Sequence, residues 1–264
     1  RLMHGLVPLD AGRLALSALC LLVVVGIARV QRLGIERMAL VAAARGTAQL
    51  LVVGSLLGGL FTHRSPWLVL ATLLVMLAVA ARTAASRTDR PLPGLARLSG
   101  VALATGTLLG VGFMTFVVVR PDPWYDPQYL VPFAGMLLGN AMNGASLAGE
   151  RFREEVALRT EEIESRLALG LSGPESVHPA LARALRAAMM PTLNAFAVAG
   201  VVQLPGMMTG QILSGTPPVD AVKYQILIFV LLTSSTAASA LLLLLLIRRR
   251  LLTPAHQLRT ELLR

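Results

Sequence analysis

The feature that most constrains this chain is a series of long apolar runs separated by short polar stretches. Apolar residues make up 55% of the 264 residues and charged residues 14%, and the mean hydropathy of +0.69 is far from that of soluble globular domains. A run of about 20 apolar residues is long enough to cross a bilayer. Because lipid offers no hydrogen-bond partner to an open backbone, such runs fold as helices. The sequence therefore predicts an all-α, polytopic protein embedded in the lipid bilayer.

We predict about seven transmembrane helices, which together make the whole chain, 1–264, a single transmembrane domain. The third run is short for a span, and the boundaries follow the apolar runs only approximately. The predicted spans are residues 14–30, 38–60, 66–81, 99–119, 130–149, 192–214 and 224–247.

Basic residues are distributed unevenly over the two sides that seven alternating spans define. Eighteen of the 24 Lys and Arg residues fall on one side and five on the other, with Arg45 inside a span. Cytosolic loops of membrane proteins are rich in Lys and Arg. We therefore predict a multi-pass protein of the cell (inner) membrane, with its N-terminus outside and its C-terminus in the cytosol. The net charge of +10 then reflects topology and not nucleic-acid binding.

The only long polar stretch, residues 150–191, falls on the predicted cytosolic side. Charge pairs four residues apart predict that the fifth span continues as a helix to about Leu169. Gly170 is a typical helix end, and Ser172 followed by Glu175 is a capping-box pattern. Pro179 is expected to interrupt the chain after this capping box and to start a second short helix. The segment is either a solvated linker between two spans or a helical coupling segment that docks on a cytosolic partner.

Polar residues inside spans are costly and usually face the protein interior. In the fifth predicted span Asn140 and Asn143 lie three residues apart, and in the second Gln49 lies one turn from Arg45. These amides either line a substrate path or hydrogen-bond between helices. Arg45 either faces the protein interior together with these amides or extends its side chain to the membrane surface.

The sixth predicted span carries Gln203, Met207 and Gln211 at intervals of four residues, which would form one stripe on a helix. Pro205 lies in the middle of this span and predicts a kink or a break. Met207 is either a soft ligand or an ordinary core residue, so whether this chain holds a metal stays unknown. The predicted substrate path comprises Gln49, Asn140, Asn143, Gln203, Met207 and Gln211.

Motifs for catalysis and nucleotide binding are absent from the sequence. A P-loop needs a lysine after a glycine-rich loop, and the single lysine, Lys223, follows no such loop. The four histidines show no metal-ligand spacing, and no protease motif occurs. We therefore expect a transport protein that is not itself an enzyme and binds no cofactor.

Four segments resemble the permease subunits of FetB-like iron-export ABC transporters, a family that includes plant aluminium-tolerance relatives. They are "ARGTAQLLVVG" at 44–54, "GMLLGNAMNGASLAGERF" at 135–152, "LALGLSGPESVHPALARALRAAMMPTLN" at 167–194 and "GVVQLPGMMTGQILSGTPPVDAVKYQI" at 200–226. The resemblance implies export of iron or a related metal or small substrate. It also implies a homodimeric permease paired with a separate cytosolic ABC ATPase, which would bind ATP and magnesium.

The coupling segment would then insert into a groove on that ATPase. We predict an apolar contact at Leu171, Val177 and Leu181, and a polar one at Arg183 and Arg186. The alternative is an ATP-independent secondary transporter or channel, which would not need a segment of this form.

Overall fold

The computed structural model describes residues 10–63, 65–86, 92–255 and 257–262, and regular structure in these ranges is almost entirely helical. The chain divides into two compact units. The first comprises Arg1–His63 with Gly210–Thr216, and the second comprises Arg64–Thr209 with Pro217–Arg264.

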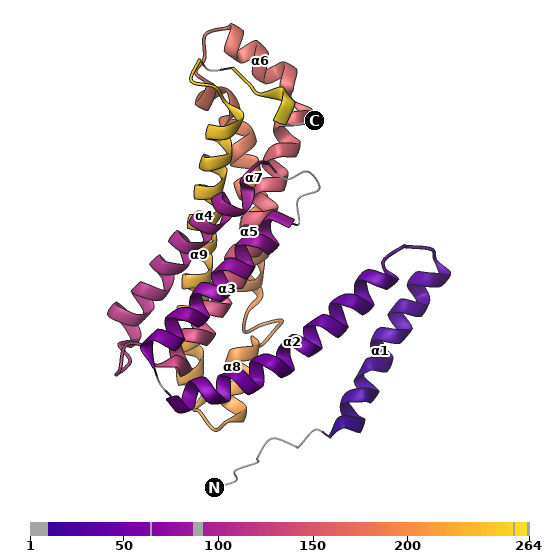
Figure 1. Ribbon diagram of the computed structural model, residues 1–264, viewed down its shortest axis with the longest axis vertical. Coiled ribbons are helices and arrows are strands. Elements are labelled where there is room, and N and C mark those ends of the chain that lie inside the picture. The colour runs from indigo at the N-terminus through magenta and orange to yellow at the C-terminus, as the bar shows by residue number, and fades with distance from the viewer. Residues whose placement is uncertain (1–9, 64, 87–91, 256, 263–264) are drawn as a thin grey trace. The chain divides into compact units, whose positions relative to one another are not determined.

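The first unit is built on a helical hairpin of α1 (Ala11–Val30) and α2 (Glu36–His63) (Figure 1). Asp10 caps α1, because its carboxylate accepts a hydrogen bond of 2.8 Å from the backbone N–H of Arg13. The turn between the helices requires two left-handed residues, Arg32 and Gly34. None of the most apolar stretch of α2 is buried in the chain, which suits a helix surrounded by lipid.

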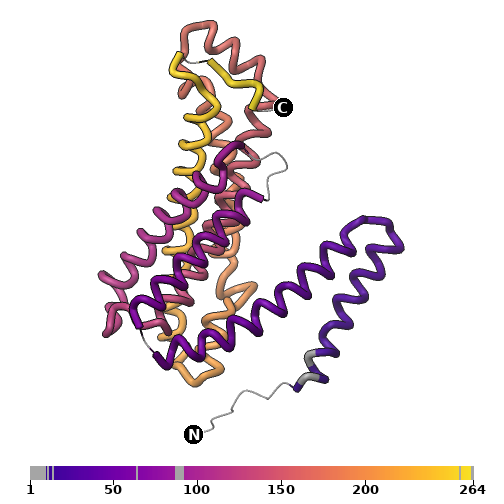
Figure 2. Tube along the Cα trace, in the orientation of Figure 1, coloured from indigo at the N-terminus to yellow at the C-terminus, as the bar shows by residue number. Residues whose placement is uncertain are grey.

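The second unit is a bundle in which α9 (Pro218–Leu251) packs against three other helices (Figures 1 and 2). Its partners are α4 (Leu95–Phe113), α5 (Pro127–Leu158) and α7 (Gly173–Val198), and α3 (Pro66–Ser86) packs against α4 and α5. The shorter elements of the chain are the π-helical η1 (Met114–Val119), α6 (Thr160–Ala168), α8 (Gly206–Leu213) and the 3-10 turn η2 (Thr260–Leu262).

Small residues bring the bundle helices into close contact. Ala141, Ala145 and Ala148 on α5 are fully buried, as is Ala240 on α9. Between lipid-embedded helices such close packing replaces the hydrophobic effect as the main source of association. The helices in the core of the second unit can therefore pack closely only because the side chains between them are small.

Four helices in the described residues are long and apolar enough to cross a membrane: Glu36–His63, Pro66–Ser86, Leu95–Val119 and Pro218–Leu251. They match the predicted second, third, fourth and seventh spans. Ala15–Val30, in the first predicted span, forms a shorter apolar helix. The helical fold class is confirmed, whereas the count of seven spans stays a prediction.

The sixth predicted span, 192–214, is not one helix. α7 ends at Val198 and α8 begins at Gly206, with an irregular segment between them. Gly200 there adopts a left-handed conformation, and its N–H donates to the carbonyl of Gln203 at 2.9 Å. Pro205 has no N–H to continue a helix. The break predicted at Pro205 is thus present, but the single helical stripe through Gln203, Met207 and Gln211 was wrong.

The segment predicted to be cytosolic, residues 150–191, is organised differently from the prediction in two respects. The helix that continues the fifth span stops at Leu158, and α6 begins after a break at Arg159. Pro179 starts no second helix, because α7 runs unbroken from Gly173. A proline in the second turn removes one helical hydrogen bond, and the buried Val177 and Ala180 on either side hold the helix against the core.

The predicted end and start signals between α6 and α7 are confirmed. Gly170 is left-handed with φ of 91°. The Ser172 hydroxyl oxygen accepts from the N–H of Glu175 at 3.4 Å, and the Glu175 carboxylate accepts from the N–H of Ser172 at 2.9 Å. This reciprocal capping box fixes where α7 begins.

Candidate functional site

A cavity of about 180 Å³ lies between α5, α7 and α9 in the second unit. Its polar wall is made by Asn140 and Asn143 of α5 and Thr192 of α7. The remaining lining residues are small or apolar: Gly144, Leu147, Ala188, Pro191, Ala195, Phe229 and Leu232. The lining of the cavity therefore combines a few amide and hydroxyl groups with a larger number of small or apolar side chains.

The spacing of the two asparagines places them on one face of α5. Residues three apart are neighbours on a helix surface, so both side chains border the same space. One N–H of the Asn140 amide donates to the carbonyl of Met136 at 3.0 Å, which holds that side chain along the helix. Gly144 lets α9 approach, since a Cβ there would collide with the side chain of Thr236.

α9 contributes one aromatic and one aliphatic side chain to the lining, Phe229 and Leu232. The ring of Phe229 stacks on that of Phe196 of α7, with centroids 4.9 Å apart and planes 7° from parallel. Met207 packs against the same apolar cluster. The rings thus join α7 to α9 beside the cavity.

The other predicted path residues do not line this cavity. Gln203 lies exposed in the irregular segment between α7 and α8, and Met207 is a partly buried core residue. Gln49 and Gln211 belong to the first unit, with Gln49 exposed on α2. Of the six predicted residues, the structure brings Asn140 and Asn143 together at one cavity, and the roles of the other four stay predictions.

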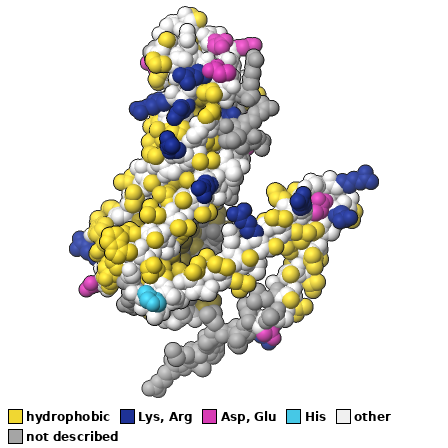
Figure 3. All heavy atoms as spheres, in the orientation of Figure 1, with side chains coloured by type: hydrophobic (Ala, Val, Ile, Leu, Met, Phe, Trp, Pro, Cys, Tyr) yellow, Lys and Arg dark blue, Asp and Glu magenta, His cyan; other side chains and the backbone are white. Residues whose placement is uncertain are grey.

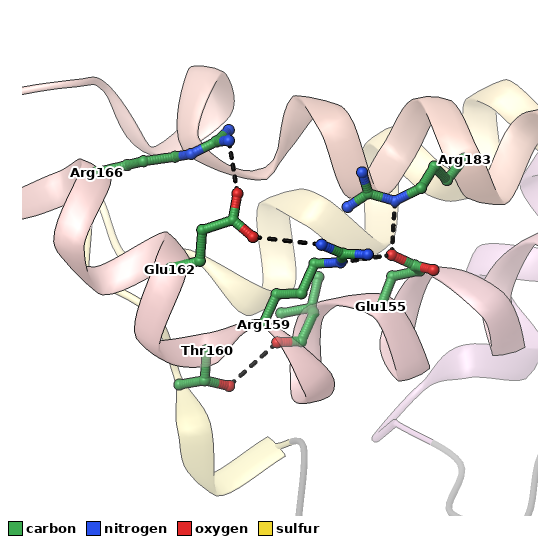
Figure 4. A network of polar contacts seen from close by, with 7 residues as sticks. Glu155, Arg159, Thr160, Glu162, Arg166 and Arg183 are labelled. Atoms are coloured by element: carbon green, nitrogen blue, oxygen red, sulfur yellow. Dashed lines mark hydrogen bonds and ion pairs between the residues drawn. The ribbon is translucent and has the colours of Figure 1, made fainter.

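A network of ion pairs joins the end of α5 to α6 and α7 (Figure 4). Glu155 accepts from Arg183 of α7 at 2.7 Å and from Arg159 at 3.0 Å. Glu162 of α6 pairs with Arg159 at 3.4 Å and with Arg166 at 2.6 Å. The contact between Glu155 and Arg183 links residues 28 positions apart in the sequence, so it ties two different helices together.

The described residues contain no group of three or more His, Cys, Asp or Glu side chains that could hold a metal ion. The polar groups that line the cavity are the side-chain amides of Asn140 and Asn143 and the hydroxyl of Thr192, which carry no charge. Amide and hydroxyl oxygens bind cations more weakly than carboxylates or thiolates.

The family model described as "Uncharacterised protein family (UPF0014)" matches residues 11–252. This chain belongs to the UPF0014 family. It is 38% identical to the UPF0014 membrane protein slr1647 of Synechocystis sp., over 87% of this chain and 88% of that protein. No solved structure matches it.

Two further relatives carry more informative names. The chain is 29% identical to Protein ALUMINUM SENSITIVE 3 of Arabidopsis thaliana, over 88% of this chain and 84% of that protein. It is also 29% identical to the Probable iron export permease protein FetB of Escherichia coli, over 83% of each. The resemblance found in the four sequence segments is confirmed, and this UPF0014 chain is a membrane protein.

The predicted coupling residues of this UPF0014 protein have very different environments. Leu171 is 40% exposed beside the α6–α7 turn, and Arg183 and Arg186 are exposed on α7. Val177 and Leu181 are only 1% and 5% exposed and pack in the main core. Replacing Val177 with Asp would bury a carboxylate and act first on folding. A contact with a partner is therefore tested at exposed positions instead.

Sequence reasoning missed the residues that complete the cavity. Phe229 and Leu232 lie in an unbroken apolar stretch, residues 226–232, where no polar face reveals which side chains point inward. Thr192 was missed as well, although a hydroxyl at the start of the sixth predicted span was a signal that could have included it.

The Glu155 network of this UPF0014 protein makes a testable contribution to stability. The hydrogen bond from Arg183, opposed by partial desolvation and aided by Arg159, lowers the pKa of Glu155. A carboxyl with a lowered folded pKa stabilises the fold above its unfolded pKa and loses that effect as pH falls through the folded pKa. We expect Arg183→Ala to cost about 0.2–1 kcal/mol at neutral pH and nothing once pH lies below both pKa values.

Thermal unfolding of the purified protein at neutral and acidic pH, in low and high salt, measures this effect. Arg151→Ala is the matched control, because Arg151 pairs with Glu154 inside α5 at 2.8 Å and joins no second helix. An Arg183→Ala penalty that persists at acidic pH would show that Glu155 is not the partner responsible.

Proposed function

We propose that this chain is the membrane permease subunit of an ABC transporter that exports iron or a related metal or small substrate. ATP hydrolysis would take place on a separate cytosolic ATPase, and two copies of the permease would pair with two ATPases in the inner membrane. Family membership and the relative named as a probable iron export permease support the transport class. The uneven distribution of basic residues supports a cytosolic position for the α6–α7 turn and the C-terminus.

The observation that carries the proposal is the continuity of α7. This helix starts at the capped turn at Gly173 and runs to the cavity wall at Thr192 without a break. At 1.5 Å per residue, these positions are about 28 Å apart along the helix. A rigid element that reaches both a surface turn and a substrate-sized cavity can pass movement from one to the other.

The α6–α7 turn presents an apolar surface, which we define as Leu169 and Leu171. Their side chains are 80% and 40% exposed, and the ion pairs around Glu155 hold the adjoining helices in place. Exposed apolar side chains that lie together on a rigid turn can mark a site of contact with another protein. We propose that this surface contacts the ATPase.

The oxygen atoms that line the cavity would bind a cation only weakly, which suits a substrate that must leave the site again. Sites for transported ions need enough affinity to admit the ion and too little to trap it. Asn140, Asn143 and Thr192 offer neutral oxygens that can contact a hydrated or chelated cation. The proposed path runs through this cavity.

Co-purification with co-expressed cytosolic ABC ATPases tests the proposal. We expect Leu171→Asp to weaken ATPase binding by about 2 kcal/mol, or roughly 30-fold in Kd. Leu158→Asp is the matched control, because Leu158 is 83% exposed but is the last residue of α5, before α6 begins at Thr160. The permease alone should show no metal efflux from proteoliposomes.

Two outcomes would contradict the proposal. Metal efflux by the permease without any ATPase would identify an ATP-independent transporter or channel. Equal ATPase binding by wild type and Leu171→Asp would remove the α6–α7 turn from the interface and, with it, the proposed route of coupling.

A further inference from the structure

The α1–α2 hairpin carries an open groove of about 580 Å³ at its turn, separate in residues from the transport cavity. Arg29 comes from the last turn of α1, and Glu36, Arg37, Leu40 and Val41 come from the first two turns of α2. Figure 3 shows the basic side chains gathered at the turn end of the hairpin, with hydrophobic side chains along both helices. The groove thus combines a cationic end with an apolar wall.

The backbone of the turn fixes the groove. The N–H of Leu33 donates to the carbonyl of Ala28 at 3.0 Å, and that of Arg32 donates to the carbonyl of Arg29 at 3.2 Å. Left-handed conformations at Arg32 and Gly34 then direct the chain into α2. The spacing between Arg29 and Arg37 is therefore set by hydrogen-bonded structure.

The positive charge at this turn is not neutralised by ion pairs. Among the described residues, no ion pair involves Arg29, Arg32 or Arg37. Glu36 contributes one negative charge to the groove, so residues 29–37 carry a net charge of +2. An arginine beside a membrane surface with no carboxylate partner is a strong donor for a phosphate group.

The apolar part of the groove distinguishes a lipid from a free anion. Leu40 and Val41 are 42% and 56% exposed, and the flanking Val30 and Met38 are 80% and 68% exposed. α2 continues beyond them as an unburied apolar helix. Inorganic phosphate would gain nothing from these side chains, whereas the acyl chains of a phospholipid would cover them.

We propose that this groove binds an anionic phospholipid of the cytosolic leaflet, with its phosphate at Arg29 and Arg37 and its acyl chains along Leu40 and Val41. The cytosolic leaflet is the anionic one, and basic pockets at helix ends on that side recognise lipid headgroups. This lipid would fix the depth of the hairpin in the membrane. The site depends on the predicted orientation but not on the transported substrate or on the ATPase.

Lipid retention by the purified chain tests the site. The protein is incubated with mixed vesicles of three parts phosphatidylcholine to one part phosphatidylglycerol, repurified in detergent and examined by native mass spectrometry. We expect phosphatidylglycerol to be retained over phosphatidylcholine, and Arg29→Gln and Arg37→Gln each to reduce that retention about tenfold. Arg45→Gln is the matched control, because Arg45 is exposed on α2 but does not line the groove.

Two further arms separate the sources of phosphate. Leu40→Gln is expected to reduce phosphatidylglycerol retention, and excess inorganic phosphate is expected not to displace the lipid. Gel filtration and circular dichroism establish that each variant is folded before it is scored. Displacement by inorganic phosphate would identify a simple anion site, and an equal loss in Arg45→Gln would identify unspecific surface charge. Either result overturns the lipid site, and neither affects the proposed transport function.

Discussion

Gly106→Val is expected to destabilise the second unit strongly, whereas Gly112→Val on the same helix is expected to be tolerated. A Cβ at Gly106 would collide with the Ser239 hydroxyl and would lie 2.5 Å from the carbonyl oxygen of Ser235 on α9. That oxygen belongs to the helix backbone, so it cannot rotate away as a flexible side chain would. Only separation of α4 from α9 would make room for the new side chain.

We expect a cost of about 3 kcal/mol, at the upper end of the range for overpacked cores. This is a large part of the stability of a typical domain. Gly112 is the matched control because a Cβ there meets nothing within 4 Å, and both substitutions have the same effect on helix propensity. Thermal unfolding in detergent and the yield of monodisperse protein measure the difference. Equal behaviour of the two variants would show that α4 and α9 are not in contact at Gly106.

The sequence predicted best those structural features that depend only on residues close together in the sequence. The capping box of Ser172 and Glu175 and the left-handed Gly170 depend on a few consecutive positions, and the structure has both. The helical fold class followed equally directly, because apolar length alone requires helices in lipid.

Features that depend on how helices face one another could not be read in the same way. An apolar stripe on a helix is the same signal whether it covers the chain's own core or a partner. Val177 and Leu181 illustrate this, since their stripe packs in the core of this chain. The pair between Glu155 and Arg183 joins two helices, and no local spacing indicates that contact.

The candidate cavity was predictable on one wall only. Asn140 and Asn143 stand out in an apolar span because buried amides are costly there. Phe229 and Leu232 do not stand out, because residues 226–232 of α9 are all apolar and the side that faces inward is set by contacts with α4, α5 and α7. The helical stripe expected through Gln203 failed for a different reason: α7 ends at Val198, the left-handed Gly200 turns the chain away, and a helix resumes only at Gly206, after Gln203.

Replacing Asn143 with Leu is expected to abolish transport without preventing assembly, if the cavity carries the substrate. Leucine has the same branched arrangement of four side-chain heavy atoms as asparagine, so the helix contacts of α5 should remain. A cation crossing the cavity would lose a polar oxygen and meet an apolar surface in its place. A barrier raised by about 2.7 kcal/mol corresponds to a hundredfold loss of rate, and we expect a decrease of at least this order.

ATP-dependent metal uptake into inside-out vesicles that contain the permease and its ATPase measures this effect. ATPase pull-down and ATP hydrolysis are followed in the same preparations, so that a transport defect is separated from a failure of assembly. Asn194→Leu is the matched control: Asn194 lies on α7 close to the cavity, is exposed and does not line it. Normal transport by Asn143→Leu would assign the asparagines to helix packing. A transport defect with intact ATPase binding would instead place the substrate between α5, α7 and α9, where movement of α7 can open or close the cavity.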